Sequence, residues 1–244
     1  MNRVGILCAL QTEAQHLGPV TLGGPCARLA DGTLIHVSGM GPDAASQGAR
    51  ALVESGAAAL ASWGLAGALA PTLAAGDILI PEFITAGEGT TRATTADWRV
   101  RLSHALSEQH RVMGGMLLSR PAVVRTAVEK TALFRTTGAI AVDMESLAVA
   151  AVADDQRLPF IAVRVIVDRA DDALPVAVTS ATDAQGRVRI WRMLTGLMAE
   201  PAQIPSLLRL SWRYRAARQV MAAAGPSLAN RQYAFPPSTV RAAS

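Results

Sequence analysis

Residues 138–172 read GAIAVDMESLAVAAVADDQRLPFIAVRVIVDRADD, and the stretch predicts a strand, a helix and a second strand. The first strand is the short apolar run 139–142, which is followed directly by the acids Asp143 and Glu145. Residues 146–156 are rich in Ala and Val and are long enough for a buried helix. The sequence therefore places two acids where a strand passes into a helix.

The second strand begins after Pro159 and covers 160–167, a β-branched run typical of a strand buried on both faces. This run also ends in an acid, Asp168. We interpret the stretch as one βαβ unit whose two strands each present a carboxylate at the C-terminal end. Open parallel sheets bind ligands outside these strand ends, so the acids indicate a site that stabilises positive charge and moves a proton.

The composition is that of a globular protein with a large core. The 244 residues have a mass of 25.5 kDa, half of them are apolar and 17% are charged, which excludes a disordered chain. We assign residues 1–200 to a single domain and residues 201–244 to a C-terminal basic amphipathic helix and tail. The net charge is +4, and no basic cluster is interleaved with aromatic residues, which argues against a nucleic-acid partner.

Apolar runs along the chain predict an α/β fold: one mixed, twisted sheet flanked by helices. Asp31-Gly32 is a strong hairpin signal, and an antiparallel pair this early argues against a purely parallel sheet. Strands are expected at 3–10, 26–30, 33–37, 57–63, 78–85 and 113–119, helices from 42 to about 55 and at 96–110, 126–135 and 190–198, and loops at 64–68 and 87–95.

The cysteines and the N-terminus favour a cytoplasmic protein. Cys8 and Cys26 have neither zinc-site nor disulfide-framework spacing, and a buried reduced thiol within the first strand suits a reducing compartment. The apolar run at 4–10 is too short for a signal peptide. Residues 57–75 carry no charge, but their glycines and Pro71 indicate a strand and a loop better than a membrane span.

The segment 206–221 has the pattern of a basic amphipathic helix. Such a helix could lie on a membrane surface or a partner, or pack on its own domain with solvated arginines. The apolar positions that share one face are Leu207, Leu210, Tyr214, Ala217 and Met221. Residues after Pro226 are expected to be a disordered tail.

Two small-residue stretches, SGMGP at 38–42 and GLAGA at 64–68, suggest close backbone approach to one ligand. Gly39, Gly41 and Ala44 fit the dinucleotide fingerprint, so an NAD-dependent oxidoreductase is an alternative. The acid that such a fold needs about 20 residues further on is absent. A Gly-rich turn with free N–H groups at a helix start also suits an anion or a hydroxyl.

Three acids, Glu13, Glu145 and Asp168, are placed at strand ends where they could act together. Each alone has a structural explanation: Glu13 and Glu145 suit the first turn of a helix, and Asp168 could cap a turn. Asp143 is expected to face solvent or a neighbouring Arg. The case for a site comes from three acids beside two small-residue stretches.

The sequence resembles the purine nucleoside phosphorylase and nucleosidase superfamily, in particular methylthioadenosine/adenosylhomocysteine nucleosidase. The resemblance covers about residues 3–172, with the motifs in the family's order. These motifs are VGILCALQTEAQHL at 4–17, SGMGPDAAS at 38–46, GLAGALAPTLAAGDILIP at 64–81 and AVDMESLAVAAVADDQRLPFIAVRVIVDRAD at 141–171.

The resemblance implies cleavage of the N-glycosidic bond of a purine nucleoside through an oxocarbenium-like transition state. It implies that Asp168 protonates or hydrogen-bonds purine N7, that Glu145 holds the ribose hydroxyls, and that Glu13 orients and deprotonates an attacking water. The other substrate-binding residues we assign are Gly39, Met40, Gly41, Leu65, Ala66, Gly67, Val124, Asp143 and Met144.

Departures from the family pattern point to an unusual substrate. Val167 and Leu65 stand where the family usually has Ser, and residues 122–124 offer no aromatic to stack on a base. The segment 81–113 is short, which would leave the 5′ side of the sugar open. Together with the Arg-rich helix, this favours a large or lipid-like 5′ substituent and resembles the hopanoid-associated phosphorylase branch, thought to act on adenosylhopane.

The nucleophile is open between water and phosphate. Glu13 favours water because a carboxylate would repel phosphate, whereas phosphorylases bring arginines to the pocket, and Arg50, Arg92 and Arg120 are candidates. We expect no metal and no bound cofactor, with phosphate at most a co-substrate, and the resemblance implies a homo-oligomer such as a dimer. A non-catalytic purine- or lipid-binding module on the same fold is the remaining alternative.

Overall fold

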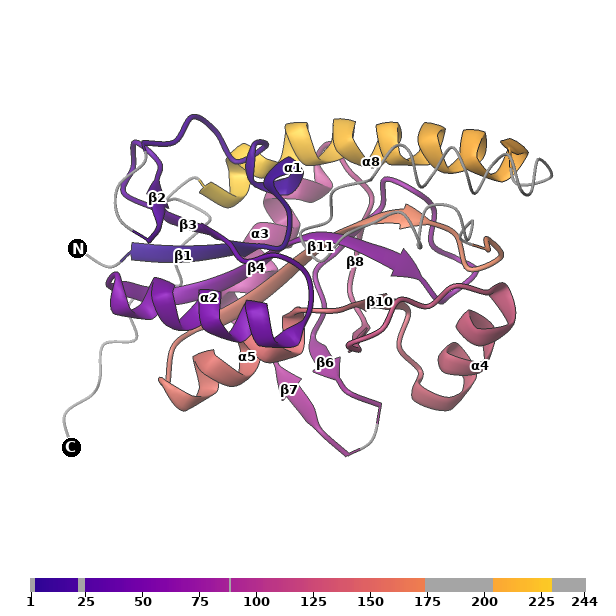
Figure 1. Cartoon of the computed structure of the whole chain (residues 1–244), viewed down its shortest axis with the longest axis horizontal. Helices are drawn as coiled ribbons and strands as arrows, with labels where there is room; N and C mark the ends of the chain where they lie inside the picture. Colours follow the sequence, from indigo (N-terminus) through magenta and orange to yellow (C-terminus); the bar gives the residue numbers. More distant parts are fainter. Residues whose placement is uncertain (1–2, 22–24, 88, 174–203, 230–244) are drawn as a thin grey trace.

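A single sheet with helices on both faces organises the chain in this computed structural model (Figure 1). The structure describes residues 3–21, 25–87, 89–173 and 204–229. The helix expected at 190–198 and the tail beyond 229 lie outside these residues. The predicted mixed α/β sheet flanked by helices is confirmed.

The strands are short except at the centre of the sheet. They are β1 (Arg3–Cys8), β2 (Ala27–Arg28), β3 (Leu34–Val37), β4 (Ala57–Ala68), β5 (Ile78–Leu79), β6 (Phe83–Thr85), β7 (Thr91–Ala93), β8 (Val112–Met113), β9 (Met116–Ser119), β10 (Ala141–Asp143) and β11 (Phe160–Asp168). The helices are α1 (Gln11–Ala14), α2 (Pro42–Glu54), α3 (Ala96–Ser107), α4 (Ala127–Thr137), α5 (Ser146–Asp155) and α8 (Ile204–Ala229).

Strand β4 is the central strand, and it changes neighbours along its length. Its first part lies between β1 and β11, both parallel to it. Pairing with β1 ends where Cys8 meets Trp63, whereas β10 joins only at Gly67 and Ala68 and runs antiparallel. The sheet continues from β10 through β9 and β6 to β7 on one side, and from β1 through β3 to β2 on the other.

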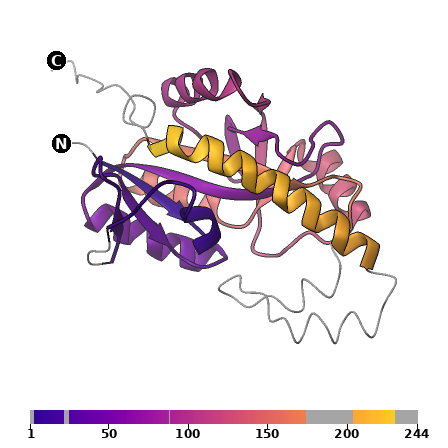
Figure 2. The same ribbon diagram turned by 90° about the horizontal axis from the view of Figure 1, so that it is seen from above.

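Two helical layers cover the sheet. Helices α2 and α5 pack on one face through apolar side chains such as Ala45, Leu52 and Val149. Helices α1, α3 and α8 cover the other face, where Trp98 and Met221 meet apolar side chains of β1, β4 and β11. Figure 2 shows α8 running obliquely across the sheet. The hairpin predicted at Asp31-Gly32 is confirmed, since β2 and β3 pair antiparallel.

Several predicted elements differ from the structure. The loop expected at 64–68 is the second half of β4, because these backbone groups pair with β11 and β10. The strand expected at 78–85 is two strands, since Pro81 has no N–H to continue a ladder. The loop expected at 87–95 contains β7, which pairs antiparallel with β6.

The βαβ unit of residues 138–172 is also corrected. Strand β10 is antiparallel to β4 and β11 is parallel to it, so the two strands run in opposite directions. They do not pair with each other but lie on either side of β4. The acids at their ends still meet, because both strands finish beside the same section of β4.

Helix α8 packs on its own domain. Ala217, Met221, Ala224 and Leu228 are buried in the core on the sheet face, and the helix continues past Pro226 to Ala229, where a disordered tail was expected. Its exposed face carries arginines, and Trp212 is 70% exposed. No helix of the described residues is long and apolar enough to cross a membrane.

Gly225 lies where α8 packs against the start of the domain. A Cβ at this position would overlap the carbonyl oxygen of His16, which follows α1. Backbone cannot move as a flexible side chain can, so the contact requires glycine here even though Gly costs helix stability. The docking of α8 beside α1 therefore depends on one missing methyl group.

Gly225→Ala should destabilise the protein by roughly 1–3 kcal/mol through overpacking against His16. Helix propensity alone predicts the opposite sign, a stabilisation of about 0.5–1 kcal/mol. Urea unfolding measures the free energy directly. Ala223→Ser, on the exposed face of the same helix, is the control and should change it by less than about 0.5 kcal/mol. A more stable Gly225→Ala variant would refute the contact.

Candidate functional site

The site forms where β4 extends beyond β1. Between Trp63, the last partner of β1, and Gly67, the first residue to pair with β10, one side of β4 has no neighbouring strand among the described residues. On its other side, Asp168 of β11 is opposite Gly67. Asp143 ends β10 one residue after Val142, which also pairs with Gly67. The carboxylates of β10 and β11 thus approach one stretch of β4 from two sides.

A buried guanidinium holds this region together. Arg164, in the middle of β11, is 2% exposed. Its Nε donates to Oδ2 of Asp143 at 2.8 Å, and its terminal Nη2 donates to Oγ of Ser62 at 2.6 Å and to Oγ of Ser146 at 2.9 Å. These partners come from β10, β4 and α5. One cation therefore joins two strands and a helix to its own strand.

Asp143 is buried and pairs with an arginine. Of the two surroundings expected for it, solvent is wrong and the neighbouring Arg is confirmed. Its Oδ2 also accepts from the backbone N–H of Ser146 at 3.0 Å, which starts α5. Its Oδ1 is buried without a hydrogen-bond partner among the described residues. This atom is an acceptor that a ligand hydroxyl or a water could use.

Glu13 fills the side of β4 that lacks a strand. It is the third residue of α1 and 4% exposed, and its Oε2 accepts from the N–H of Leu10, which closes the helix start. Its Oε1 accepts from the N–H of Leu65 at 3.0 Å. The carboxylate therefore replaces a strand partner for β4, and the helix-start explanation of Glu13 holds together with its place in the site.

The glycine turn before α2 binds a carboxylate of the same protein. The N–H of Gly41 donates to Oε1 of Glu145 at 2.8 Å, and the N–H of Gly39 donates to the carbonyl of Ala9 at 3.0 Å. The expectation that these amides are free for an anion is wrong. The same fact counts against the dinucleotide alternative, because the pyrophosphate would need these donors.

Asp168 is held between two donors. Its Oδ1 accepts from the N–H of Ala68 at 3.1 Å, and its Oδ2 accepts from Nζ of Lys130 at 2.6 Å. Lys130 is 1% exposed and is the only buried residue of α4. Its Nζ also donates to the carbonyl of Arg169 at 2.7 Å. The pair is a fully buried ion pair between α4 and the end of β11.

The small residues of β4 make room for these carboxylates. A Cβ on Gly64 would lie 2.6 Å from Oε1 of Glu13 and 3.1 Å from Nη1 of Arg164. A Cβ on Gly67 would lie 3.0 Å from Oδ1 of Asp168. Both distances to carboxylate oxygens are too short for ordinary packing. The glycines let acids approach the β4 backbone, which is the physical reason for the GLAGA sequence.

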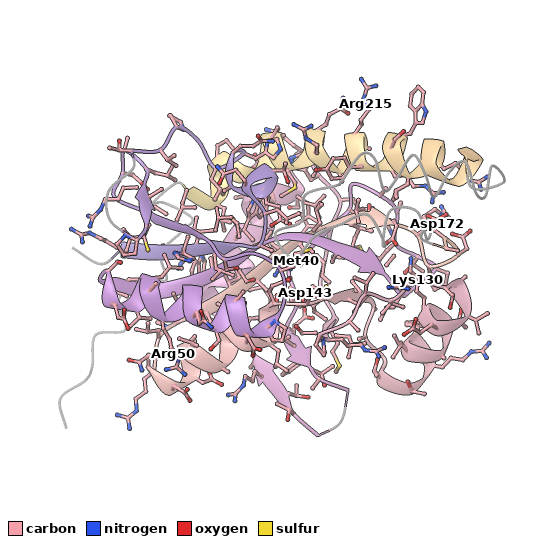
Figure 3. The ribbon with its side chains drawn as sticks, in the orientation of Figure 1. Met40, Arg50, Lys130, Asp143, Asp172 and Arg215 are labelled. Atoms are coloured by element: carbon pink, nitrogen blue, oxygen red, sulfur yellow. The ribbon has the colours of Figure 1, made fainter. Side chains whose placement is uncertain are left out.

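One cavity of about 210 Å³ joins these groups. The predicted residues that line it are Glu13, Met40, Leu65, Ala66, Gly67, Val124, Asp143, Met144, Glu145 and Asp168. Figure 3 shows Met40 and Asp143 near each other below β4, with Lys130 toward α4. Gly39 and Gly41 are not among the lining residues. The other described residues of the lining are apolar apart from Lys130, and Val123 is 42% exposed at the cavity edge.

Burial raises the pKa of the three candidate catalytic acids. For Glu13, burial outweighs the opposing effects of Arg164 and of backbone N–H donors. For Asp168, burial outweighs the opposing Lys130. Burial and the neighbouring Asp143 raise the pKa of Glu145 to about 7. The pocket therefore favours protonated acids or a positively charged guest.

Sequence reasoning missed both cations of the site. Arg164 lies inside the apolar run FIAVRVIVD, where a charge at an inward position can persist only with buried partners. Lys130 is the one lysine of the chain, in a helix whose other residues are exposed or half-buried. The charged residue within a buried strand was a usable signal. Nothing in the local sequence around Lys130 indicated burial.

Comparisons with known proteins were consistent in family and fold. The phosphorylase superfamily model matches residues 3–195. No curated protein sequence matches the chain. Among solved structures, the 5′-methylthioadenosine/S-adenosylhomocysteine nucleosidase of Helicobacter pylori, bound to butyl-thio-DADMe-Immucillin-A, has a TM-score of 0.67 and 16% identity, covering 92% of this chain and 97% of its own.

Two further structures are similar at comparable levels. The nucleosidase of the same type from Neisseria meningitidis, in complex with methylthio-immucillin-A, has a TM-score of 0.65 and 18% identity over 93% of this chain and 98% of its own. The futalosine hydrolase of Helicobacter pylori has a TM-score of 0.64 and 18% identity over 82% of this chain and 98% of its own. At such identities the similarity shows a shared fold.

Arg164→Met should destabilise the protein by about 3–5 kcal/mol, because it leaves Asp143 buried without its cation. The double variant Arg164→Met/Asp143→Asn should recover part of this loss. Urea unfolding gives both free energies. Arg120→Met is the control, since its pair with Glu129 is partly exposed and should contribute less than about 1 kcal/mol. A single variant as stable as the wild type would contradict the role of Arg164.

Glu145→Gln should stabilise the protein at pH 8 but not at pH 4.5. A carboxyl whose folded pKa is raised binds more protons folded than unfolded, so its contribution to stability is lost as pH rises from about 4.5 through 7. The difference between the unfolded and folded pKa values of Glu145 limits the gain in unfolding free energy to about 3 kcal/mol. Unfolding free energies across this range measure it, with Glu54→Gln on the exposed surface of α2 as control. Equal effects at both pH values would exclude the raised pKa.

Proposed function

Since the chain belongs to the phosphorylase superfamily of enzymes, we propose that it hydrolyses the N-glycosidic bond of a purine nucleoside, and specifically of a 5′-substituted adenosine. The observation that carries the proposal is the convergence of Glu13, Glu145 and Asp168 on one cavity. All three have raised pKa values, and a ribosyl cation is the guest that such a cavity stabilises.

The roles of the acids follow from their neighbours. Asp168, beside Lys130, passes a proton to the purine as the base leaves, so that the departing nitrogen does not carry a full negative charge. Glu145, oriented by the amide of Gly41, faces the ribose hydroxyls and the positive charge that develops on the sugar. The free Oδ1 of Asp143 is a further acceptor for a hydroxyl.

Water is the nucleophile that fits the pocket. Glu13 is fixed by the amides of Leu10 and Leu65 and can take a proton from water, which attacks the sugar carbon as the bond to the base breaks. Among the described residues, the one cation that lines the cavity is Lys130, which pairs with Asp168, so a phosphate would meet the Glu13 carboxylate without a free cation from this part of the chain. Of the cations that could bind a phosphate, Arg164 is paired with Asp143. Arg50 lies on the outer side of α2 (Figure 3).

The other two arginine candidates are engaged elsewhere. Arg92 pairs with Asp154 of α5, and Arg120 pairs with Glu129 of α4. Neither residue lines the cavity. The amides that could have bound an anion are used by Glu145 and Ala9. Hydrolysis is also the reaction named for the similar nucleosidase and futalosine hydrolase structures.

The substituent at the 5′ position is apolar in this proposal. The cavity of about 210 Å³ is smaller than the roughly 300–1,000 Å³ of most ligand pockets, so a long substituent would extend out of it. Its lining includes apolar Leu10, Met40 and Val123. Methylthioadenosine and an adenosine with a lipid-like 5′ group are the apolar candidates, and adenosylhomocysteine, whose 5′ group carries an ammonium and a carboxylate, is the polar comparison. A membrane contact through α8 and a dimeric assembly stay predictions.

The test is product analysis with adenosine and these 5′-substituted adenosines in buffer with and without labelled phosphate. We expect adenine and the free sugar, at a rate independent of phosphate. Asp168→Asn and Glu13→Gln should each lower kcat by roughly 10²- to 10⁴-fold. Asp171→Asn, which replaces an exposed acid three residues beyond Asp168, is the control and should keep the wild-type rate.

Each other outcome has a separate meaning. Formation of labelled sugar phosphate would show that phosphate and not water is the nucleophile, while the proposed cleavage of the N-glycosidic bond would stand. Adenine release by Asp168→Asn at the wild-type rate would show that Asp168 is not the acid that protonates the purine. No release from any nucleoside, with binding retained in calorimetry, would identify a non-catalytic purine-binding module.

A further inference from the structure

We propose that Lys130 is the positioning residue that keeps Asp168 supplied with the proton it delivers to the purine. The inference rests on the proposed function and goes beyond it. It begins from one unusual fact: the one lysine of the chain is 1% exposed and its Nζ lies 2.6 Å from Oδ2 of Asp168. A buried ammonium is costly, so a pair this deep needs strong compensation.

The contacts around Asp168 are those of an ionised carboxylate at rest. Both of its oxygens accept hydrogen bonds, one from Lys130 and one from the N–H of Ala68. A carboxyl acting as an acid must instead carry a proton. In the resting pocket the proton nearest to Asp168 is on Nζ of Lys130, and moving it converts the ion pair into a neutral amine and a neutral acid.

The surroundings lower the cost of that exchange. A neutral pair avoids the cost of two charges in a buried site, whereas an exposed Lys–Asp pair would hold its proton on the lysine. Lys130 keeps its position in either state through the carbonyl of Arg169, which accepts at 2.7 Å. An ammonium has three donors, and two of them are used by these partners, so the third can face the cavity that Lys130 lines.

The proposed step balances. As the glycosidic C–N bond breaks, its electron pair enters the purine ring. The N–H bond of Lys130 breaks and an O–H bond forms on Asp168, and this O–H bond breaks in turn as Asp168 gives the proton to a ring nitrogen, which leaves Asp168 ionised and Lys130 neutral. Water adds to the sugar carbon and gives its proton to Glu13. After the products leave, Lys130 regains a proton from solvent and Glu13 releases one.

Other charged groups face the pair and must be considered. Arg213 of α8 lowers the pKa of Asp168 and itself pairs with Asp172. Glu129, beside Lys130 on α4, pairs with Arg120. The remaining charged groups of the cavity region are Glu13, Asp143, Glu145 and Arg164. None of these groups is replaced in the test, so they are the same in every variant compared.

The test measures kcat for Lys130→Met, Lys130→Arg and the wild type between pH 5.5 and 8.5. For each variant, the quantity compared is the ratio of its kcat to the wild-type kcat at the same pH. Methionine removes the charge and leaves Asp168 to take its proton from solvent, so the ratio should rise at least tenfold toward pH 5.5. Arginine keeps the charge, holds Asp168 ionised and cannot release a proton, so the ratio should stay at or below roughly 10⁻² at neutral pH.

A second substrate separates the proton step from general damage. Hydrolysis of 4-nitrophenyl β-D-riboside needs no protonation of its leaving group, so Lys130→Arg should retain this activity within a few-fold. Arg135→Met, which removes an exposed cation from the same helix, should match the wild type in both assays. Circular dichroism checks that each variant is folded.

The inference is overturned if Lys130→Arg releases adenine within twofold of the wild type, since charge alone would then suffice. It is equally overturned by a Lys130→Met ratio that does not change with pH, or by equal losses on both substrates. A wild type that releases no purine would instead reject the proposed function, and the two failures cannot be confused.

Discussion

The ion pair between Arg164 and Asp143 is the interaction on which the site depends. Its guanidinium is fully buried and bonds to three elements besides its own strand, so it fixes where β10 and α5 sit relative to β4. It also supplies the positive charge that lets Glu13 and Glu145 share a cavity with Asp143. Without that cation, three neighbouring carboxylates would repel one another in a low-dielectric site.

The sheet provides the space that this charge cluster needs. Because β1 stops beside Trp63 and β10 begins beside Gly67, a section of β4 has backbone groups without a strand partner on one side. Buried N–H groups must find acceptors, and Glu13 supplies one to Leu65. The acid is therefore a structural substitute for a strand and, in the function we propose, also the group that takes a proton from water. Glycine at position 64 is required because any side chain would displace that carboxylate.

Local sequence was sufficient to find the acids and insufficient to find how they meet. Asp143, Glu145 and Asp168 could be predicted because a buried strand that ends in an acid is a visible pattern. The direction of β10 could not, since a three-residue strand pairs as its neighbours dictate and carries no signal of orientation. Small residues disfavour strands, so the sequence GLAGA predicts a loop, yet here the lack of large side chains allows Glu13 and Asp168 to approach the backbone of β4.

The cations were harder to predict for a related reason. Arg164 and Lys130 are buried because they pair with Asp143 and Asp168, which are 21 and 38 residues away in the sequence. The sequence around a charged residue does not identify such a partner, because only the fold brings the two together. The expectation of free amides at Gly39 and Gly41 was wrong for the same reason. The acceptors of these amides, Ala9 and Glu145, come from distant segments. Patterns along the chain predict elements, whereas satisfied buried polar groups are a property of the assembled molecule.

The charge balance of the cavity explains why such a site would accelerate glycosidic cleavage rather than bind a nucleoside tightly. Among the described residues, four carboxylates face two cations, and burial raises the pKa of three of these acids, Glu13, Glu145 and Asp168. A neutral nucleoside gains little from this excess of negative potential. An oxocarbenium-like sugar gains a great deal, and it exists only at the transition state, so the stabilisation is differential and lowers the barrier. The same excess would repel phosphate, which is why we propose water as the nucleophile.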